Sequence, residues 1–479
     1  MARAGRPGER MGVERAVVPA ARRGLRMAVL VVLAGVGAGL VGAAMAALRA
    51  VVPAARRGLR MAVLVVLAGV GAGLVGAAMA ALLLLVEAVT YGQASGSLLE
   101  EVESASDLRR VIGPLVGGAL AGGGWWWLRR RVDVHTVEDA LTDEAPRLPL
   151  RRTVLDALLQ ILVVGSGASI GREGAPRQAS AALADALSSR FEVSAASRRA
   201  VMAAAAGAGL AAVYNVPLAG AVFALETLPV RRDVRAVLIA AAMSGIATVV
   251  AWPVVTSDPT YRFPVVTPTP EVVLVTLAWT GACVPAAALV GAAFHRLARW
   301  ARGHPPAPGW RLPLFVGGAS ALVGVASIAL PALPGNGKDI LQLAYSTHAG
   351  LSLFAVLLIV KPVATALCLR SGAVGGLLTP ALATGGALGA VVASPLGAYS
   401  GGVVLPVFAL LGAAGVLAVT QRAPLFGAVM AWELAHAPLW TAPFVLLTAF
   451  GARHLARAAA LGRRALSARL RSTEEPPVA

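Results

Sequence analysis

The stretch SIGREGAPRQ, residues 169–178, interrupts an apolar segment with charge and glycine. It follows the run LDALLQILVVGSGA and precedes the helix-like ASAALADAL. Backbone that leaves a helix inside a membrane must be buried in protein or line a cavity. A helix that starts there presents unpaired N–H groups and the positive end of its dipole, which together favour an anion. Gly171 and Gly174 allow the backbone to approach a ligand closely, and Pro176 suits the first turn of the following helix.

The composition of the whole chain indicates a membrane protein. Of the 479 residues, 57% are hydrophobic and 14% charged, and the mean hydropathy is +0.75. A soluble globular chain carries about 25% charged residues, whereas apolar runs of about 18 or more residues predict membrane spans. The sequence therefore predicts an all-α polytopic membrane protein. Its apolar runs are 61–86, 154–170, 236–253, 271–294, 351–369 and 403–420.

The net charge of +18 comes mostly from arginine and is dispersed in short clusters such as RRGLR and VRRDVR. Basic clusters that flank spans follow the positive-inside bias, so we expect the lipid bilayer, and no nucleic acid, as the partner of this charge. The two cysteines, Cys283 and Cys368, lie in apolar runs and have no disulfide or metal-binding spacing. We therefore expect a multi-pass protein of the cell membrane with no metal and no other cofactor.

The N-terminal region contains a perfect duplication. RAVVPAARRGLRMAVLVVLAGVGAGLVGAAMAAL occupies residues 15–48 and again 49–82. Each copy carries RRGLR ahead of its apolar run, so each prefers to start on the cytoplasmic side. Two successive spans cannot both do so across a short connection. We expect the second copy to be the functional helix, and the first to be either an extra segment or an artefact of duplication.

A more diverged repeat divides the membrane part into two halves. PLAGAVFALE (217–226) and PLFGAVMAWE (424–433) share the pattern P-L-x-G-A-V-x-A-x-E, and the glycine turns GREGAP (171–176) and GGLLTP (375–380) precede them. The offsets between the copies are 207 and 204 residues. Such repeats are typical of transporters whose inverted halves place the substrate site at the midplane, on broken helices. A chance match of both features is the alternative.

The repeat predicts a four-part organisation. We expect a basic N-terminal tail with the duplicated apolar segment at 1–54 and a first membrane half at 55–235. A second membrane half at 236–461 and a short basic cytoplasmic tail at 462–479 follow. We expect no regulatory domain after the membrane part.

The two glycine turns predict a single site with two walls. Gly375 and Gly376 open the second turn as Gly171 opens the first. Two helix N-termini at the midplane would attract an anion without a full positive charge, which would hold it too tightly for release. Glu173 stands at the helix start, where an anion would bind. It would compete with the anion when ionised and leave when protonated. The alternatives are a structural pair with Arg172 and a charge at the pore mouth.

At these motifs the sequence resembles the CLC family of chloride channels and proton/chloride antiporters. GREGAPRQ is similar to the family's G-[KR]-E-G-P with Ala175 before the proline, LRSGAVGGLLTP to its S-G-x-x-G-G-x-F-x-P, and TQRAPLFGAVMAWEL to its later R-A-P-L-x-G stretch. The resemblance covers about residues 55–460 and implies a homodimer with inverted halves and one anion pathway per subunit. It also implies that Glu173 is the external gating glutamate, and that the backbone amides of Leu377 and Leu378 coordinate the central anion.

Three positions depart from the family pattern. The family's G-S-G-x-P serine would fall just before VEDAL (137–141), where this sequence has RRRVDVHT, and its late tyrosine would fall near 461–466, which is LGRRAL. Thr227 stands where many antiporters have an internal proton-relay glutamate, and Glu226 matches a neighbouring carboxylate. Glu226 and Thr227 are therefore our candidates for a proton path. The departures leave anion selectivity and proton coupling open.

Three further residues invite a functional interpretation. Lys361 lies inside the apolar LLIVKPVATAL, where it would either contribute to the potential of the anion pathway or snorkel as an anchor. His436 follows the second P-L-x-G element as a proton carrier or a helix-end residue. Ser169 lies in a G-x-S-x-G match, but a hydrolase needs a strand–turn–helix context and a histidine, so we expect no enzyme.

The sequence thus predicts transmembrane transport of small inorganic anions, with chloride preferred, through a CLC-type pathway gated by Glu173. We expect passive or loosely proton-coupled movement. The alternatives are a strict proton/anion antiporter for chloride or fluoride, and a regulatory membrane protein that transports nothing. The expected anion-binding residues are Gly171, Arg172, Gly174, Gly375, Gly376, Leu377 and Leu378.

Overall fold

The computed structural model describes residues 53–474, except for 93–95, 132–134, 143–146, 308, 347–349 and 401–403. The first copy of the duplication, 15–48, lies outside the described residues, whereas the second copy forms most of α3. The helices of the first half are α3 (Pro53–Tyr91), α4 (Leu98–Ser104), α5 (Asp107–Arg129), α6 (Val137–Ala140), α7 (Leu150–Gly165), α8 (Gly174–Arg190), α9 (Ala195–Tyr214), α10 (Pro217–Glu226) and α11 (Val234–Val255).

The second half repeats this order of long and short helices, except that it has no counterpart of the short α4. It consists of α12 (Pro270–Gly303), α13 (Leu312–Ala329), α14 (Lys338–Tyr345), α15 (Leu351–Arg370), α16 (Leu378–Ser400), α17 (Val404–Gln421), α18 (Pro424–Leu434), the 3₁₀ turn η1 (Leu439–Thr441) and α19 (Ala442–Glu474). The helix α19 continues through the boundary that the sequence predicted at residue 461.

Six of the described helices are long and apolar enough to cross a membrane: Gly58–Tyr91, Val234–Val255, Pro270–Gly303, Leu312–Ala329, Leu351–Arg370 and Leu439–Gly462. Four of them contain apolar runs expected from the sequence. The expectation missed Leu312–Ala329, although this segment is nearly as apolar as the predicted spans, and Leu439–Gly462, which ends among arginines. The run expected at 154–170 is instead cut short, because α7 ends at Gly165 and the chain then leaves the helix.

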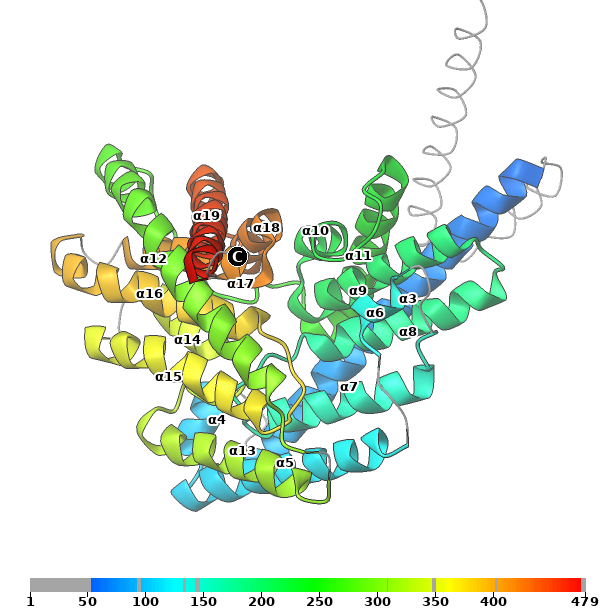
Figure 1. Cartoon of the computed structure of the whole chain (residues 1–479), viewed down its shortest axis with the longest axis horizontal. Helices are drawn as coiled ribbons and strands as arrows, with labels where there is room; N and C mark the ends of the chain where they lie inside the picture. The colour runs from blue at the N-terminus through cyan, green and yellow to red at the C-terminus, as the bar shows by residue number, and fades with distance from the viewer. Residues whose placement is uncertain are drawn as a thin grey trace, which may run out of the picture.

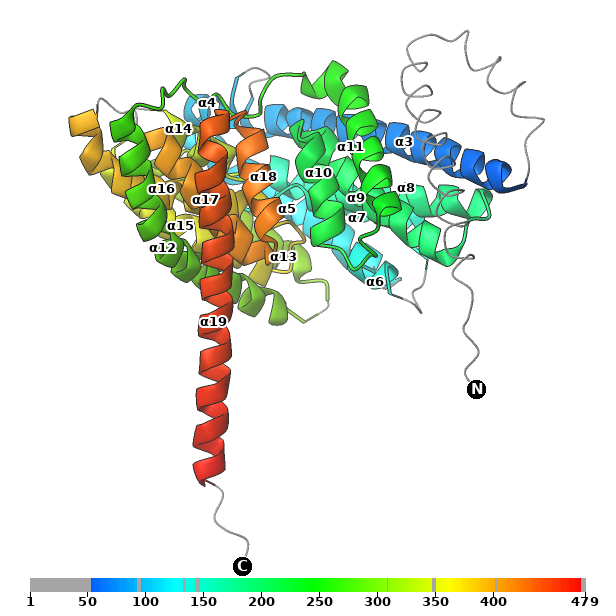
Figure 2. The same ribbon diagram turned by 90° about the horizontal axis from the view of Figure 1, so that it is seen from above.

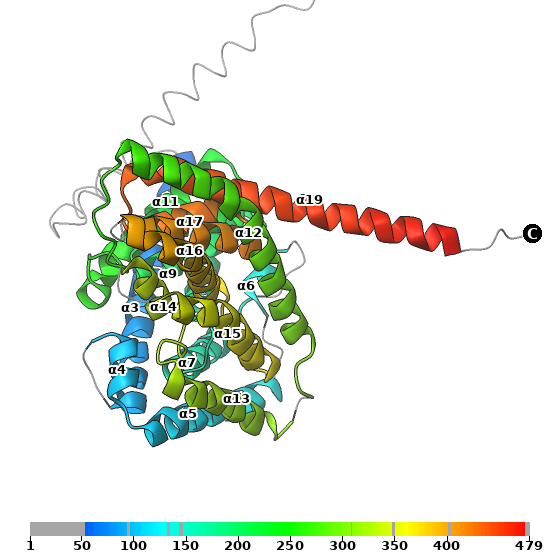
Figure 3. The same cartoon turned by 90° about the vertical axis from the view of Figure 1, so that its left-hand side faces the viewer.

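The helices form two groups side by side (Figure 1). Helices α3 and α7–α11 lie together on one side, α12 and α14–α19 on the other, and α5 packs against α13 below both groups. Within each group the same neighbours meet, α8 with α9 and α16 with α17. Figures 2 and 3 show α19 extending well beyond this body.

The repeat seen in the sequence has the same backbone in both halves. Asn215 ends α9 in the left-handed region with φ of 55°, and Arg422 takes φ of 59° after α17. In each half a proline then begins the next helix, Pro217 in α10 and Pro424 in α18, where its fixed φ and missing N–H are tolerated. The shared pattern P-L-x-G-A-V-x-A-x-E therefore encodes one structural unit used twice.

Candidate anion-binding site

The two glycine turns lie against each other at the centre of the protein. The Gly171 N–H donates to the Gly376 carbonyl at 2.9 Å, and the Gly376 N–H donates to the Gly171 carbonyl at 2.8 Å. This pair of hydrogen bonds fixes the start of α8 beside the start of α16. The broken helices predicted from the two halves therefore meet.

Glu173 occupies the N-terminus of the opposite helix. It precedes α8 directly, its side chain is 0% exposed, and its Oε1 accepts a hydrogen bond of 2.5 Å from the Leu378 N–H in the first turn of α16. Its Oε2 has no hydrogen-bond partner among the described residues. The carboxylate thus lies where a helix N-terminus would receive a free anion.

Glycine at both turns leaves room for the carboxylate of Glu173 to lie against their backbone. A Cβ added at Gly376 would collide with Oε1 of Glu173, and one at Gly171 would collide with both carboxylate oxygens. Gly174 faces the opposite side, where a Cβ would collide with the Gln160 side chain. Leu378 is buried, so its backbone N–H faces the site while its side chain joins the core.

Arg172 does not form the structural pair that was the alternative for Glu173. No ion pair joins the two residues in the described part of the chain. The Arg172 guanidinium instead lies over the ring of Tyr214, 4.9 Å from its centroid. The Tyr214 hydroxyl in turn makes a buried hydrogen bond of 2.9 Å with Thr379 in α16. Tyr214 and Thr379 were not predicted from the sequence. Only their positions next to or within the repeated motifs could have indicated a role.

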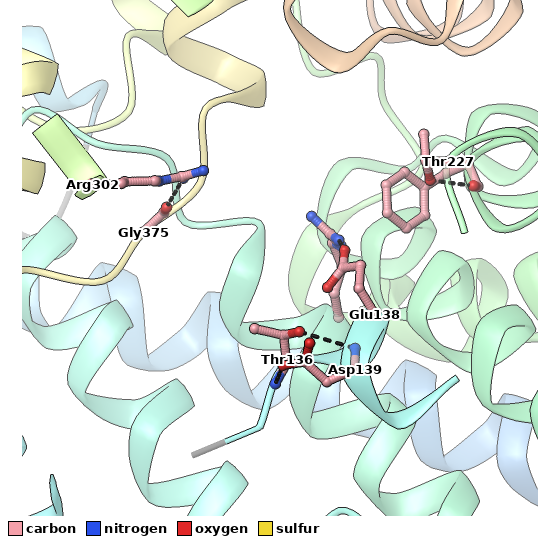
Figure 4. Close-up of polar contacts among 8 residues, drawn as sticks. Thr136, Glu138, Asp139, Thr227, Arg302 and Gly375 are labelled. Carbon is pink, nitrogen blue, oxygen red and sulfur yellow. Dashed lines mark hydrogen bonds and ion pairs between the residues drawn. The ribbon is translucent and has the colours of Figure 1, made fainter. Parts of the chain in front are cut away.

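Two arginines that the sequence analysis also missed flank the site. Arg302, in the last turn of α12, donates to the Gly375 carbonyl at 2.9 Å, and Arg177 in α8 pairs with Glu138 at 3.1 Å. Figure 4 shows the hydrogen bond between Arg302 and Gly375, and Glu138 at a separate position in the same view. Both arginines interact electrostatically with Glu173. Arg302 therefore places positive charge beside the paired turns, whereas Glu138 offsets the charge of Arg177.

Comparison with known proteins fits this geometry. A model of the voltage-gated chloride channel family matches residues 117–457. The chain belongs to this family. It is 29% identical over 359 residues to the voltage-gated ClC-type chloride channel ClcB of Shigella flexneri, covering 71% of this chain and 82% of that protein. It is 30% identical over 386 residues to a ClcB-like chloride channel protein of Ralstonia nicotianae, covering 75% and 85%.

Solved CLC structures share the fold. A slow cyanobacterial Cl⁻/H⁺ antiporter superposes with a TM-score of 0.71 at 19% identity, covering 85% of this chain and 98% of that one. A CLC-type fluoride/proton antiporter superposes with a TM-score of 0.62 at 21% identity, covering 83% and 95%. The CLC architecture of two inverted halves and the membrane location expected from the sequence are therefore confirmed, and anion transport is the activity of the family.

The two candidate proton-path residues are both engaged in helix-end hydrogen bonds. The Thr227 hydroxyl donates to the Phe223 carbonyl at 2.5 Å, one turn back along α10. The Glu226 carboxylate accepts from the Leu425 and Phe426 N–H groups at 3.2 and 2.5 Å, and so caps the start of α18. In this CLC protein Glu226 therefore links the two halves, and its part in a proton path stays a prediction.

Glu433 makes the reciprocal cap. It is the last residue of the second P-L-x-G-A-V-x-A-x-E copy, and its carboxylate accepts from the Leu218 and Ala219 N–H groups at 2.9 and 2.6 Å. Each copy of the repeat thus supplies the acceptor for the free N–H groups of the other copy. A carboxylate at a helix N-terminus also interacts favourably with the helix dipole.

Lys361 does not snorkel. Its side chain is fully buried, and its ammonium donates to Ser169 Oγ at 2.8 Å, to the Leu333 carbonyl at 3.0 Å and to the Gly335 carbonyl at 2.8 Å. All three donors of the ammonium are used. Lys361 therefore ties the segment before the first glycine turn to the second half, and its contribution to the pathway potential stays a prediction.

The structure also places the other residues that the sequence singled out, and the proton-carrying role of His436 stays a prediction. The Ser169 hydroxyl donates to the Leu333 carbonyl at 3.2 Å and accepts from Lys361, so it belongs to the buried hydrogen-bond network around the lysine. His436 is exposed, has φ of 42° and follows the end of α18. Thr136, the hydroxyl residue just before VEDAL, is the N-cap of α6. Hydrogen bonds from Thr136 hold the pKa of Asp139 below its usual range.

Proposed function

We propose that this protein conducts chloride across the cell membrane through a site at the paired glycine turns, and that Glu173 is its protonatable gate. The observation that carries the proposal is the hydrogen bond from the Leu378 N–H to the buried Glu173 carboxylate. The bound anion takes the place of this carboxylate at the start of α16. Gly171, Gly174, Gly375 and Gly376 shape the site, and the Leu377 and Leu378 amides coordinate the anion.

Protonation changes the competition between Glu173 and the anion. The ionised carboxylate accepts a charge-assisted hydrogen bond, which is about twice as strong as a neutral one. A neutral carboxylic acid accepts more weakly, so its side chain leaves and the anion gains the Leu378 N–H. Anion flux therefore rises as the pH falls.

Arg302 and Arg177 attract the anion toward the turns. This CLC protein has neither the serine nor the tyrosine that the family resemblance places at the central site. The Arg302 guanidinium supplies positive charge beside the site instead, and Arg177 adds to it to the extent that Glu138 does not offset its charge. Because they lie beside the site and not within it, they raise the local anion concentration without holding the anion too tightly.

The proposed transport is passive or only loosely coupled to protons. Thr227 replaces the expected relay carboxylate, and Glu226 is held by two backbone amides. Strict antiport of chloride or fluoride is the second candidate, because the two solved relatives are described as Cl⁻/H⁺ and fluoride/proton antiporters. We also propose a homodimer, as the family resemblance implies.

The test is anion efflux from proteoliposomes loaded with potassium chloride, with proton movement recorded in parallel. We expect wild-type flux to rise between pH 7.5 and 4.5, and Glu173→Gln to give flux that does not depend on pH. Glu103→Gln is the matched control, because Glu103 is exposed and lies outside the site. An unchanged pH dependence in Glu173→Gln would exclude the gate. Uphill proton pumping by the wild type would exclude passive movement, and no flux at all would favour the non-transporting alternative.

A further inference from the structure

A cavity of about 690 Å³ lies outside the anion site, between the start of α13 and the end of α15. Trp310, Arg311, Leu314, Phe315, Leu322 and Arg370 line it together with residues of the loop before α13. Its volume is within the range of about 300–1,000 Å³ for sites that hold small molecules. None of the residues of the paired glycine turns lines it.

The position of the cavity in the fold places one end in water and the other in lipid. Both α13 and α15 are apolar enough to cross the membrane, and the two helices contact each other. Arg311 directly precedes α13, and Arg370 is the last residue of α15. The N-terminus of α13 and the C-terminus of α15 therefore lie at the same membrane surface, and the apolar turns of both helices extend from there into the bilayer.

The two arginines have no anionic partner among the residues that the structure describes. Neither Arg311 nor Arg370 forms an ion pair within the described part of the chain, and both are exposed. Arg311 lies over the indole of Trp310, 5.4 Å from the ring centroid, which orients the guanidinium at the rim of the cavity. Tryptophan at the level of the lipid headgroups is typical of membrane interfaces.

The wall below the arginines is apolar and uncovered. Leu314 is 65% exposed, Leu322 57% and Phe315 47%. These residues follow one another along α13 away from Arg311, so they form a hydrophobic path from the membrane surface toward the bilayer interior. A free phosphate ion would contact the arginines but would leave this path empty.

We propose that the cavity binds one anionic phospholipid of the surrounding bilayer. Its headgroup phosphate pairs with Arg311 and Arg370, and one acyl chain lies along Leu314, Phe315 and Leu322. Basic pockets between membrane helices bind anionic headgroups in this way. The site also borders the segment that leads to the second glycine turn, because Ser371 lines the cavity and Gly375 follows four residues later.

The first test measures lipid binding to the full-length protein in detergent by native mass spectrometry, with phosphatidylglycerol and phosphatidylcholine as probes. We expect the double variant Arg311→Gln/Arg370→Gln to bind phosphatidylglycerol about thirtyfold more weakly, which corresponds to about 2 kcal/mol. The control Arg231→Gln/Arg235→Gln removes the same charge from two exposed residues, one just before α11 and one in its first turn, and should bind like the wild type. Equal binding by all three proteins would overturn the proposal.

The second test does not depend on the folding of the arginine variant. Brominated lipids quench tryptophan fluorescence at short range, and the part of the quenching that is lost in Trp310→Phe belongs to this cavity. We expect this part to be at least threefold larger with brominated phosphatidylglycerol than with brominated phosphatidylcholine. Equal quenching by both lipids would mean that any bilayer lipid contacts Trp310, and the proposal would then be wrong.

Discussion

The reciprocal caps between α10 and α18 give the sharpest prediction about how the two halves are held together. Glu433 accepts two N–H groups at the start of α10, and Glu226 accepts two at the start of α18. Replacing either carboxylate with glutamine keeps the size of the side chain but removes the charge. It also turns one acceptor into a donor that faces an N–H group.

The expected losses follow from the burial and geometry of each cap. A hydrogen bond to a charged group contributes about 1.5–3 kcal/mol. Glu433 is buried and its bonds measure 2.9 and 2.6 Å, so Glu433→Gln should cost about 2–3 kcal/mol of folding free energy. Glu226 is only partly buried and one of its bonds measures 3.2 Å, so Glu226→Gln should cost about 1–2 kcal/mol. The double variant should lose less than the sum, because both caps act on one helix pair.

The assay is thermal unfolding in detergent, followed as the fraction of protein that stays monodisperse in size-exclusion chromatography. With an unfolding entropy of about 2.1 cal/mol/K per residue, Glu433→Gln should lower Tm by about 2–3 °C. Glu103→Gln again serves as the control, because its carboxylate makes no contact of this kind. A Tm of Glu433→Gln equal to that of the control, or a larger loss in Glu226→Gln, would refute the cap argument.

Three further variants probe the site and its support. Arg302→Gln should weaken chloride binding several-fold in calorimetry, whereas Arg302→Lys should retain most of it; equal affinities would remove Arg302 from the pathway. Lys361→Met leaves the buried Gly335 carbonyl without its donor, whereas the Leu333 carbonyl keeps the Ser169 hydroxyl, so it should cost about 1–3 kcal/mol and lower Tm by about 1–3 °C; a Tm equal to that of the wild type would contradict the structural role of Lys361. Gly376→Ala places a methyl group against the Glu173 carboxylate and should abolish the pH dependence of flux, which a normal pH profile would disprove.

The sequence predicted the two turns but not what surrounds them. Gly171 and Gly376 could be found because a glycine-rich break in an apolar run has few explanations in a membrane. The repeat ending in Glu226 and Glu433 was visible, yet its purpose was not, because a repeat does not reveal which helix a terminal carboxylate faces. That assignment requires the antiparallel placement of α10 against α18, which only the structure supplies.

The same limit applies to the charged residues. Lys361 stood out in its apolar run, but its partners lie 26 to 192 residues away in the sequence, so its buried role could not be separated from snorkelling. Arg302 carried no signal at all, because an arginine after a long span fits the positive-inside bias. Its hydrogen bond to Gly375 depends on where α12 ends in space.

The proposed anion site is built mostly from backbone, so the chain can depart from its family at the central side chains without losing it. The Gly171–Gly376 pairing and the free N–H groups at the start of α16 do not depend on a hydroxyl side chain. A serine or tyrosine would add a ligand to the anion, and its loss changes how strongly different anions are distinguished. The helix start and the competing carboxylate remain, because they need only glycine at two turns and a glutamate at one helix end. Selectivity should therefore vary within this fold more readily than gating does.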